Sequence, residues 1–124
     1  GSLVRRMEGH TNTVLSVCAS GKNIVSGSQD NTIKVWDSST GECVNTLEGH
    51  TEAVSSVDAN GSIICSGSSD GTVRVWDAAA SVTESKAVGH SQNVRWVRFN
   101  RKGDKLMSCS GRVYCVWDCA TGDL

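Results

Sequence analysis

Three histidines in this chain each follow a glycine, namely His10, His50 and His90. Ser26, Ser28 and Asp30 lie downstream of the first of them. Histidine, serine and aspartate are the side chains of a hydrolase triad, in which the imidazole takes the serine proton and the carboxylate orients the imidazole. These residue types therefore raise a catalytic hypothesis, with His10 as the base and Ser26 or Ser28 as the nucleophile.

The spacing argues against that hypothesis, because the same set of residues occurs again at the same distances. His50, Asp70 and Ser66 or Ser68 repeat the arrangement forty positions later. A catalytic site occurs once in a fold, whereas hydrogen bonds that stabilise a structural unit recur with that unit. We therefore predict that these side chains are structural and that the chain is not an enzyme.

The whole chain is built from a repeat with a period of 40 or 41 residues. The stretches "GHTNTV", "GHTEAV" and "GHSQNV" begin at Gly9, Gly49 and Gly89, and "IKVWD", "VRVWD" and "YCVWD" end at Asp37, Asp77 and Asp118. From Gly9 and from Gly49 onward, 17 of 29 positions are identical without a gap. A fixed period of this length is the signature of a repeat architecture.

Within one repeat the pattern predicts four short strands and leaves no room for a helix. The strand-like stretches are residues 14–19, 23–28, 32–37 and 43–48, and Gly, Asn, Asp or Ser residues separate them. Four strands joined by such turns form an antiparallel meander. We therefore predict an all-β fold.

Forty-residue units with Gly-His and Trp-Asp signatures and four strands resemble WD40 repeats. The resemblance implies β-propeller blades, three four-stranded antiparallel blades per chain. It also implies that the segment before each Gly-His is the outer strand of one blade and the segment after it the inner strand of the next. The resemblance covers residues 3–124, with repeats at about 9–48, 49–88 and 89–124 and residues 3–8 as an outer strand. Gly1 and Ser2 look like a remnant of cloning outside the fold.

The resemblance further implies roles for the recurring polar residues. The histidine before the inner strand would bond the aspartate of the tight turn and a serine of the second strand, and that serine would reach the tryptophan indole. The implied networks are His10–Asp30–Ser26–Trp36 and His50–Asp70–Ser66–Trp76, with the choice between the two serines of each Ser-Gly-Ser left open. Such a partly buried network satisfies its donors and strengthens each bond.

The third repeat departs from this pattern. It keeps His90, Ser108 and Trp117, but Gly111 stands where the turn aspartate is expected, and the turn is one residue shorter. Its first hairpin is longer, with residues 100–105 in place of a Ser-Gly turn. We predict that this blade lacks the aspartate link and is the least rigid. Either the repeat has decayed or its turn serves another use.

Three blades are too few to close a propeller, which typically has about four to eight. The start of the chain, "LVRRMEGH", matches "CVNTLEGH" at residues 43–50, and the final "TGDL" matches the "TGEC" before that strand. We predict that the N-terminal strand of one molecule completes the last blade of another, so that a second chain closes a six-bladed homodimer. The alternative is a fragment or engineered piece of a longer six- to eight-bladed protein, whose repeats only fold and assemble without a binding role.

The family resemblance implies a scaffold that binds a protein or peptide around the mouth of the central channel. The positions three and five after each Gly-His histidine, and the one before the turn aspartate, are commonly exposed there. They are Thr13, Leu15, Gln29, Ala53, Ser55, Ser69, Asn93 and Arg95. We expect Trp96 to pack between blades beside Val94 and Val97, with an interface anchor as the alternative.

Composition argues against other classes of protein. A formal net charge of −1, with no basic run longer than two residues, gives no footprint for nucleic acid. No apolar run approaches a membrane span, and no signal peptide or cofactor motif is present. The six cysteines lack CxxC or zinc spacing, so we expect reduced thiols in a cytoplasmic protein without a metal or cofactor.

Overall fold

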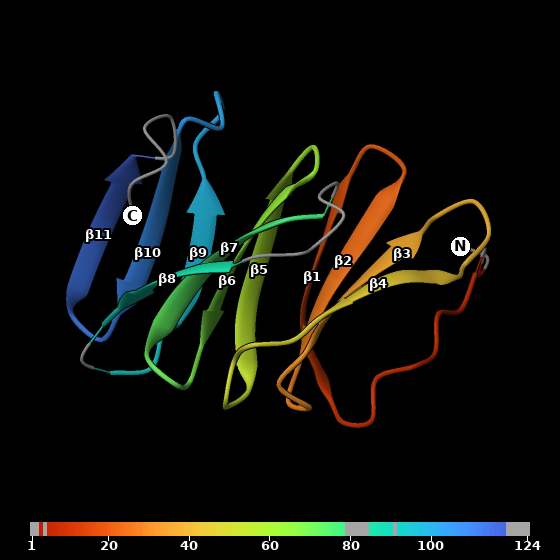
Figure 1. Ribbon diagram of the computed structural model, residues 1–124, viewed down its shortest axis with the longest axis horizontal. Helices are drawn as coiled ribbons and strands as arrows, with labels where there is room; N and C mark the ends of the chain where they lie inside the picture. Colours follow the sequence, from red (N-terminus) through yellow and green to blue (C-terminus); the bar gives the residue numbers. More distant parts are fainter. Residues whose placement is uncertain (1–2, 4, 79–84, 91, 119–124) are drawn as a thin grey trace.

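The computed structural model of the chain describes residue 3 and residues 5–78, 85–90 and 92–118. In these residues the chain forms strands and turns without a helix, which confirms the predicted all-β class. The strands make three separate antiparallel sheets that stand in a row, one for each repeat (Figure 1). Gly1, Ser2, Cys119 and the final "TGDL" lie outside the described residues.

The first two sheets have four strands each, in chain order, and the third has three strands among the described residues. The first sheet comprises β1 (Val14–Ser20), β2 (Asn23–Ser28), β3 (Ile33–Asp37) and β4 (Cys43–Leu47). The second comprises β5 (Val54–Asn60), β6 (Ile63–Ser68), β7 (Thr72–Asp77) and β8 (Ser85–Gly89). The third comprises β9 (Trp96–Phe99), β10 (Lys105–Ser110) and β11 (Val113–Asp118). In the first repeat these bounds agree with the predicted stretches to within one residue.

The inner strands β1, β5 and β9 lie side by side, and hydrogen bonds join them in one register. The backbone N–H of Val57 donates to Ser16 Oγ, and that of Val97 donates to Ser56 Oγ, both at 3.2 Å and both across 41 positions of sequence. Further along the first pair the N–H of Gly61 donates to Ser20 Oγ, again across 41 positions, so the neighbouring inner strands run in the same direction. The start of every inner strand therefore lies at the same edge of the row.

Two apolar cores fill the spaces between the sheets. We call the face of a blade that points toward the next repeat its trailing face. The opposite face, which carries the Trp-Asp tryptophan, is its leading face. Each core lies between the trailing face of one blade and the leading face of the next. The first core contains Val25, Ile33, Val35, Leu47, Val54, Val57, Ile64 and Trp76. The second contains Cys65, Val73, Val94, Val97 and Leu106. Removal of these side chains from water is the main force that holds the blades together.

A glycine in each of the two covered trailing faces lets the blades approach closely. A Cβ at Gly27 would lie 2.7 Å from Val54 Cγ1, and a Cβ at Gly67 would lie 2.5 Å from Val94 Cγ1. Neither glycine has a positive φ. Space, rather than backbone conformation, therefore requires glycine at these two positions.

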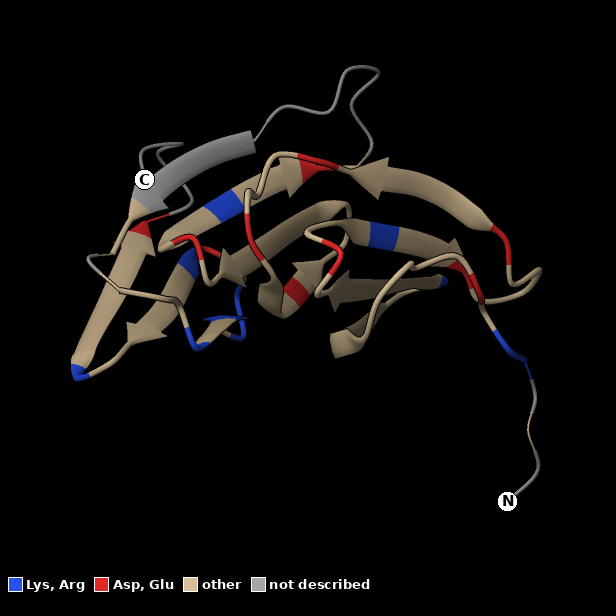
Figure 2. Ribbon diagram, turned by 90° about the horizontal axis from the view of Figure 1, so that it is seen from below, with Lys and Arg blue, Asp and Glu red and all other residues tan. Residues whose placement is uncertain are grey.

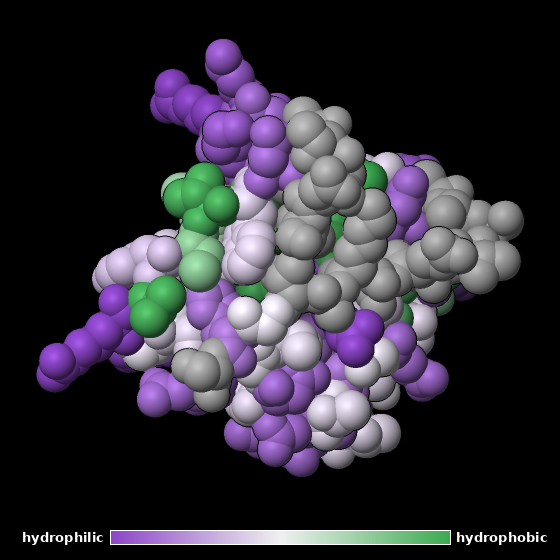
Figure 3. All heavy atoms as spheres, turned by 60° about the vertical axis from the view of Figure 1, so that its left-hand side comes forward, coloured by the Kyte–Doolittle hydropathy of each residue, from purple (hydrophilic) through white to green (hydrophobic). Residues whose placement is uncertain are grey.

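Among the described residues, the faces at the two ends of the row carry exposed apolar side chains. On the leading face of the first blade, Val14 is 45% and Val17 is 65% exposed. On the trailing face of the third blade, Tyr114 is 71% and Val116 is 65% exposed. Figure 3, which turns the β11 side of the molecule forward, shows hydrophobic atoms at the surface there. Their counterparts within the row lie between neighbouring blades and are buried, except Val75, which is half-buried.

The described residues before β1 form no strand. Arg5 Nη1 donates a hydrogen bond of 3.2 Å to the carbonyl oxygen of Thr40, and the Arg5 side chain lies against Gly41. This segment therefore runs along the first blade toward its β3–β4 turn (Figure 1). The expected pairing of residues 3–8 with a last blade involves two molecules and stays a prediction.

We predict that Gly27→Ala destabilises the protein by about 1–3 kcal/mol, because the added methyl group overpacks the contact with Val54. The matched control is Gly89→Ala, since a Cβ there would meet no atom within 4 Å. Urea unfolding followed by circular dichroism gives both free energies. Equal stability of the two variants would contradict a close approach of the blades at Gly27.

Candidate functional site

The first repeat brings its histidine, aspartate, serine and tryptophan into one hydrogen-bonded network. His10 Nδ1 lies 2.8 Å from Asp30 Oδ2, and His10 Nε2 lies 2.6 Å from Ser26 Oγ. The indole Nε1–H of Trp36 donates to the same serine oxygen at 2.8 Å. Of the two serines that the sequence left open, the first is therefore the one in contact with both rings.

The direction of each bond follows from the groups at the two ends of the network. The Asp30 carboxylate can only accept, so His10 donates from Nδ1. In the matching tautomer Nε2 accepts the hydroxyl proton of Ser26, and the Ser26 oxygen accepts from the Trp36 indole. Each polar hydrogen of this network then has a partner.

The second repeat builds the same network. His50 Nδ1 lies 3.1 Å from Asp70 Oδ2, His50 Nε2 lies 2.7 Å from Ser66 Oγ, and Trp76 Nε1 donates to Ser66 Oγ at 2.9 Å. The second serines have a different role: Ser28 Oγ and Ser68 Oγ donate to backbone carbonyls of the loop before the inner strand.

Two threonines that sequence reasoning missed complete these networks. Thr32 Oγ1 donates to Asp30 Oδ1 at 2.6 Å, and Thr72 Oγ1 donates to Asp70 Oδ1 at 2.5 Å. The threonine after the turn is identical in the first two repeats, and this identity was the available signal. Each aspartate also accepts from the backbone N–H of the residue after its histidine, Thr11 or Thr51, at 3.0 Å. The carboxylate thus ties the tight turn to the entrance of the inner strand.

Burial and hydrogen bonding act in opposite directions on the acidic groups. Burial alone would raise the pKa of Asp70, but hydrogen bonds from Thr72, the Thr51 backbone and His50 lower that pKa to about 2. For Asp30 the same balance, with bonds from Thr32 and His10, holds the pKa well below its usual range. Burial lowers the pKa of His50 and outweighs the opposite effect of Asp70. Both aspartates are therefore charged and His50 is neutral near pH 7.

The third repeat forms a shorter network. His90 Nε2 lies 2.8 Å from Ser108 Oγ, which also accepts from Trp117 Nε1 at 2.9 Å. The turn that carries Gly111, with a φ of 57°, offers no carboxylate to the imidazole. Trp117 is half-buried, whereas Trp36 and Trp76 are buried.

This geometry suits a structural role better than a nucleophile. Ser26 is only 4% exposed and Ser66 is fully buried, and each hydroxyl is already bonded to both an imidazole and an indole. A nucleophile needs an open approach and a base that is free to take its proton. The networks instead hold together the second and third strands of a blade, the turn between them and the loop before the inner strand.

The described cysteines form no disulfide, and two of them, Cys65 and Cys109, are buried as small apolar side chains. Burial, with a smaller contribution from Asp58, raises the pKa of Cys18 to about 11, so this thiol stays protonated. Among the described residues no group of three His, Cys, Asp or Glu side chains is arranged to hold a metal ion.

Most of the expected binding face lies exposed at the common edge of the inner strands. Thr13, Leu15, Gln29, Ser69, Asn93 and Arg95 are exposed, and Ala53 is half-buried. Ser55 differs from the others, because its hydroxyl donates to the backbone carbonyls of Gly67 and Val94 and so joins two blades. Acidic and basic residues are interspersed over the described ribbon (Figure 2). We refer to the six exposed residues as the rim.

Backbone hydrogen bonds fix the rim in place. The N–H of Gln29 donates to the Thr13 carbonyl at 2.9 Å, and the N–H of Ser69 donates to the Ala53 carbonyl at 3.0 Å. Each of these turns is also held by the aspartate network beneath it. The rim is therefore a set of exposed side chains on a rigid support.

Trp96 does not pack beside Val94 and Val97 as expected. Trp96 pairs with Cys109 in the sheet and its ring lies 6.1 Å from that of Tyr114, on the trailing face of the third blade. Val97 is the next residue, and successive side chains of a strand point to opposite faces. The two valines face the second blade, while Trp96 faces away from it.

Four-stranded antiparallel sheets that stack face to face, each locked by a His–Ser–Trp network, are blades of a β-propeller. The profile of the family described as "WD domain, G-beta repeat" matches residues 1–37, 41–77 and 83–118. The chain belongs to this WD40 repeat family, as its resemblance indicated. Repeats of this family generally mediate protein–protein interactions and are typically non-catalytic scaffolds.

Two curated relatives share this repeat. The chain is 45% identical over 42 residues to WD repeat-containing protein pop1 of Schizosaccharomyces pombe. These 42 residues make up 34% of this chain and 5% of the relative. It is 42% identical over 41 residues to Mitochondrial division protein 1 of Mycosarcoma maydis. These 41 residues make up 33% of this chain and 5% of the relative. The similarity therefore spans about one repeat and a small part of each relative.

We predict that Asp70→Ala lowers the free energy of unfolding by about 3 kcal/mol, because it leaves His50, Thr72 and the Thr51 N–H without their acceptor. The control is Glu48→Ala, which removes an exposed carboxylate from the loop before the second network. Denaturant unfolding measures both. A loss for Asp70→Ala no greater than for Glu48→Ala would contradict a structural role.

We predict that stability falls as the pH drops below about 6.5, the ordinary pKa of histidine. The pKa of His50 is lower in the folded state, so the unfolded chain binds more protons there and protonation favours unfolding. A further loss follows between pH 3.8 and about 2, where Asp70 is still charged when folded and already protonated when unfolded. Urea unfolding from pH 7.5 to 5 checks the first step. The slope should be shallower in His50→Gln, and an equal slope would contradict the assignment.

Proposed function

We propose that this chain is a non-catalytic WD40 scaffold that binds a protein or a peptide on its rim. The observation that carries the proposal is the exposed set of mixed side chains, of which Gln29 and Ser69 lie on turns held by the buried networks. A rigid support lowers the conformational entropy that a surface loses when it binds a ligand. The rim combines one basic side chain with uncharged polar and apolar ones. This composition suits contact with a peptide.

We further propose that the three blades work as part of a larger ring. The uncovered leading and trailing faces correspond to faces that are buried within the row, so further blades would cover them in the same manner. A second copy, with strands exchanged at the termini, would give a closed homodimer of six blades. Further repeats of a longer chain would close the ring equally well. The side chains on the trailing face of the third blade, described below, favour the second source.

We propose that the protein is located in the cytoplasm. The support is chemical: free cysteines, some of them buried as apolar side chains, are typical of proteins kept in a reducing environment. No charge pattern in the rim favours nucleic acid, and Arg95 is its only charged side chain.

We predict that a peptide selected against this protein from a random phage-displayed library binds the rim. Leu15→Asp should weaken its binding by about tenfold or more, because it places a charge in the contact. Val44→Asp makes the same kind of change on the outer strand β4, where Val44 is 58% exposed, and should leave binding unchanged. Fluorescence polarisation with the labelled peptide gives both dissociation constants. Equal effects of the two variants, or a loss only in Val44→Asp, would contradict binding at the rim.

A further inference from the structure

One row of three side chains crosses the trailing face of every blade, and it differs in the third. Strand register places one residue of the inner strand, one of the second strand and one of the third strand side by side. The rows are Ser16–Gly27–Ile33, Ser56–Gly67–Val73 and Trp96–Cys109–Tyr114. The first two rows are small at their centre, and the third carries two aromatic rings over a cysteine.

The first two rows show how a trailing face contacts the inner strand of the next blade. In each, the serine oxygen accepts a backbone N–H from the next inner strand, and the glycine leaves room for two valines of that strand. In the second junction these are Val94 and Val97, which lie 2.5 Å and 3.2 Å from a Cβ placed at Gly67. A serine and a glycine on a trailing face therefore fit a following blade that carries two valines on its inner strand.

The third row removes both features. The indole of Trp96 has no acceptor to offer a backbone N–H. Cys109 adds a Cβ and a sulfur at the position where Gly27 and Gly67 have no side chain. The rings of Trp96 and Tyr114 lie 6.1 Å apart on either side of Cys109, which is only 4% exposed. Side chains thus fill the space that valines occupy at the other two junctions.

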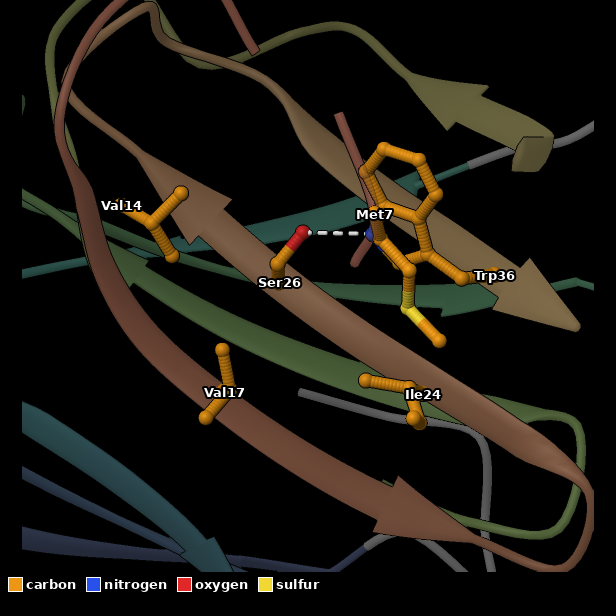
Figure 4. Close-up of a pocket in the computed structure, with 6 residues that line it drawn as sticks. All are labelled: Met7, Val14, Val17, Ile24, Ser26 and Trp36. Carbon is orange, nitrogen blue, oxygen red and sulfur yellow. Dashed lines mark hydrogen bonds between the residues drawn. The ribbon is translucent and has the colours of Figure 1, made fainter. Parts of the chain in front are cut away.

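This chain's own first blade carries the valine pair. Val14 and Val17 line its leading face with Met7, Ile24 and Trp36, around a hollow into which side chains of a preceding blade would fit (Figure 4). The equivalent hollow of the second blade is filled by the trailing face of the first blade. A second copy docked in that register would drive Val14 and Val17 into Cys109 and the two rings.

We propose that the trailing face of the third blade is a docking surface for a further blade that carries small side chains, glycine, alanine or serine, where this chain's own blades carry the valine pair. The row Trp96–Cys109–Tyr114 thereby selects against a second copy of this chain. The argument for a blade as the occupant is continuity, because Val116 and Tyr114 extend the same series of faces that blades cover elsewhere in the row. The inference rests on the proposed completion of the ring and specifies which blade completes it.

The proposal is tested by making the two surfaces fit each other. One variant, Trp96→Ser/Cys109→Gly/Tyr114→Val, copies the row of the second blade onto the third. The other, Val14→Ala/Val17→Ala, trims the leading face of the first blade and changes only exposed side chains. Each should lower the dissociation constant for self-association by at least about tenfold relative to the parent chain, since each removes the same overpacking. Sedimentation equilibrium measures all three, with the 13.1 kDa chain as the reference mass.

Val44→Ala is the control, because it makes the same valine-to-alanine change at an exposed position of β4 and should leave self-association as in the parent. The alanine pair also guards against a triple variant that fails to fold. Tight dimers of the parent that the triple variant weakens would overturn the proposal, as would a failure of the alanine pair to associate more tightly than the parent. Either result leaves peptide binding at the rim untouched, so failure of this inference and failure of the scaffold role are distinguishable.

Discussion

Close contact between neighbouring blades is the constraint on which the rest of this structure depends. Each sheet is too small to bury its own apolar side chains, so both of its faces have to be covered by other sheets. Gly27 and Gly67 make this possible by letting a valine pair approach the backbone of the sheet. Hydrogen bonds from Val57 and Val97 to serine oxygens then fix the register of one inner strand on the next. The common edge, and with it the rim, is a consequence of that register.

The polar networks complement these contacts at the edge where apolar packing ends. Ser66 and Trp76 are buried beside the apolar core, while Asp70 lies in the turn and accepts a hydrogen bond from the loop before the inner strand of the same blade. A turn of this kind would otherwise have backbone N–H groups without partners. The carboxylate remains charged because several donors outweigh the cost of its burial. The network therefore connects a buried tryptophan to a surface turn and holds that turn in place. The third network is shorter because Gly111 stands where the aspartate would be.

The sequence predicted the strands well, because alternation and turn residues are local properties. It also singled out the histidines, aspartates and tryptophans, because the repeat multiplies the signal. The choice of serine could not be made, since Ser26 and Ser28 lie on the same face and only strand pairing brings Ser26 beside the indole. Trp96 was misplaced for a similar reason: the nearest apolar residues in sequence are valines, but the pleat directs Trp96 to the face opposite Val97. The meaning of a cysteine at position 109 depends on what faces a glycine in another blade, and no local pattern contains that information.

The leading faces of the three blades are nearly alike, whereas their trailing faces are not. Each leading face presents two valines, an isoleucine or leucine, and the tryptophan, as in Val94, Val97, Leu106 and Trp117. A blade that carried only this common face could follow any other blade of its kind. Information on which blade comes next must then reside on the trailing face, where a serine and a glycine accept the common face and bulky residues reject it. Specificity among similar surfaces commonly rests on such steric exclusion. In a chain of repeats it would set the order of blades and keep the open ends of the row from meeting the wrong partner.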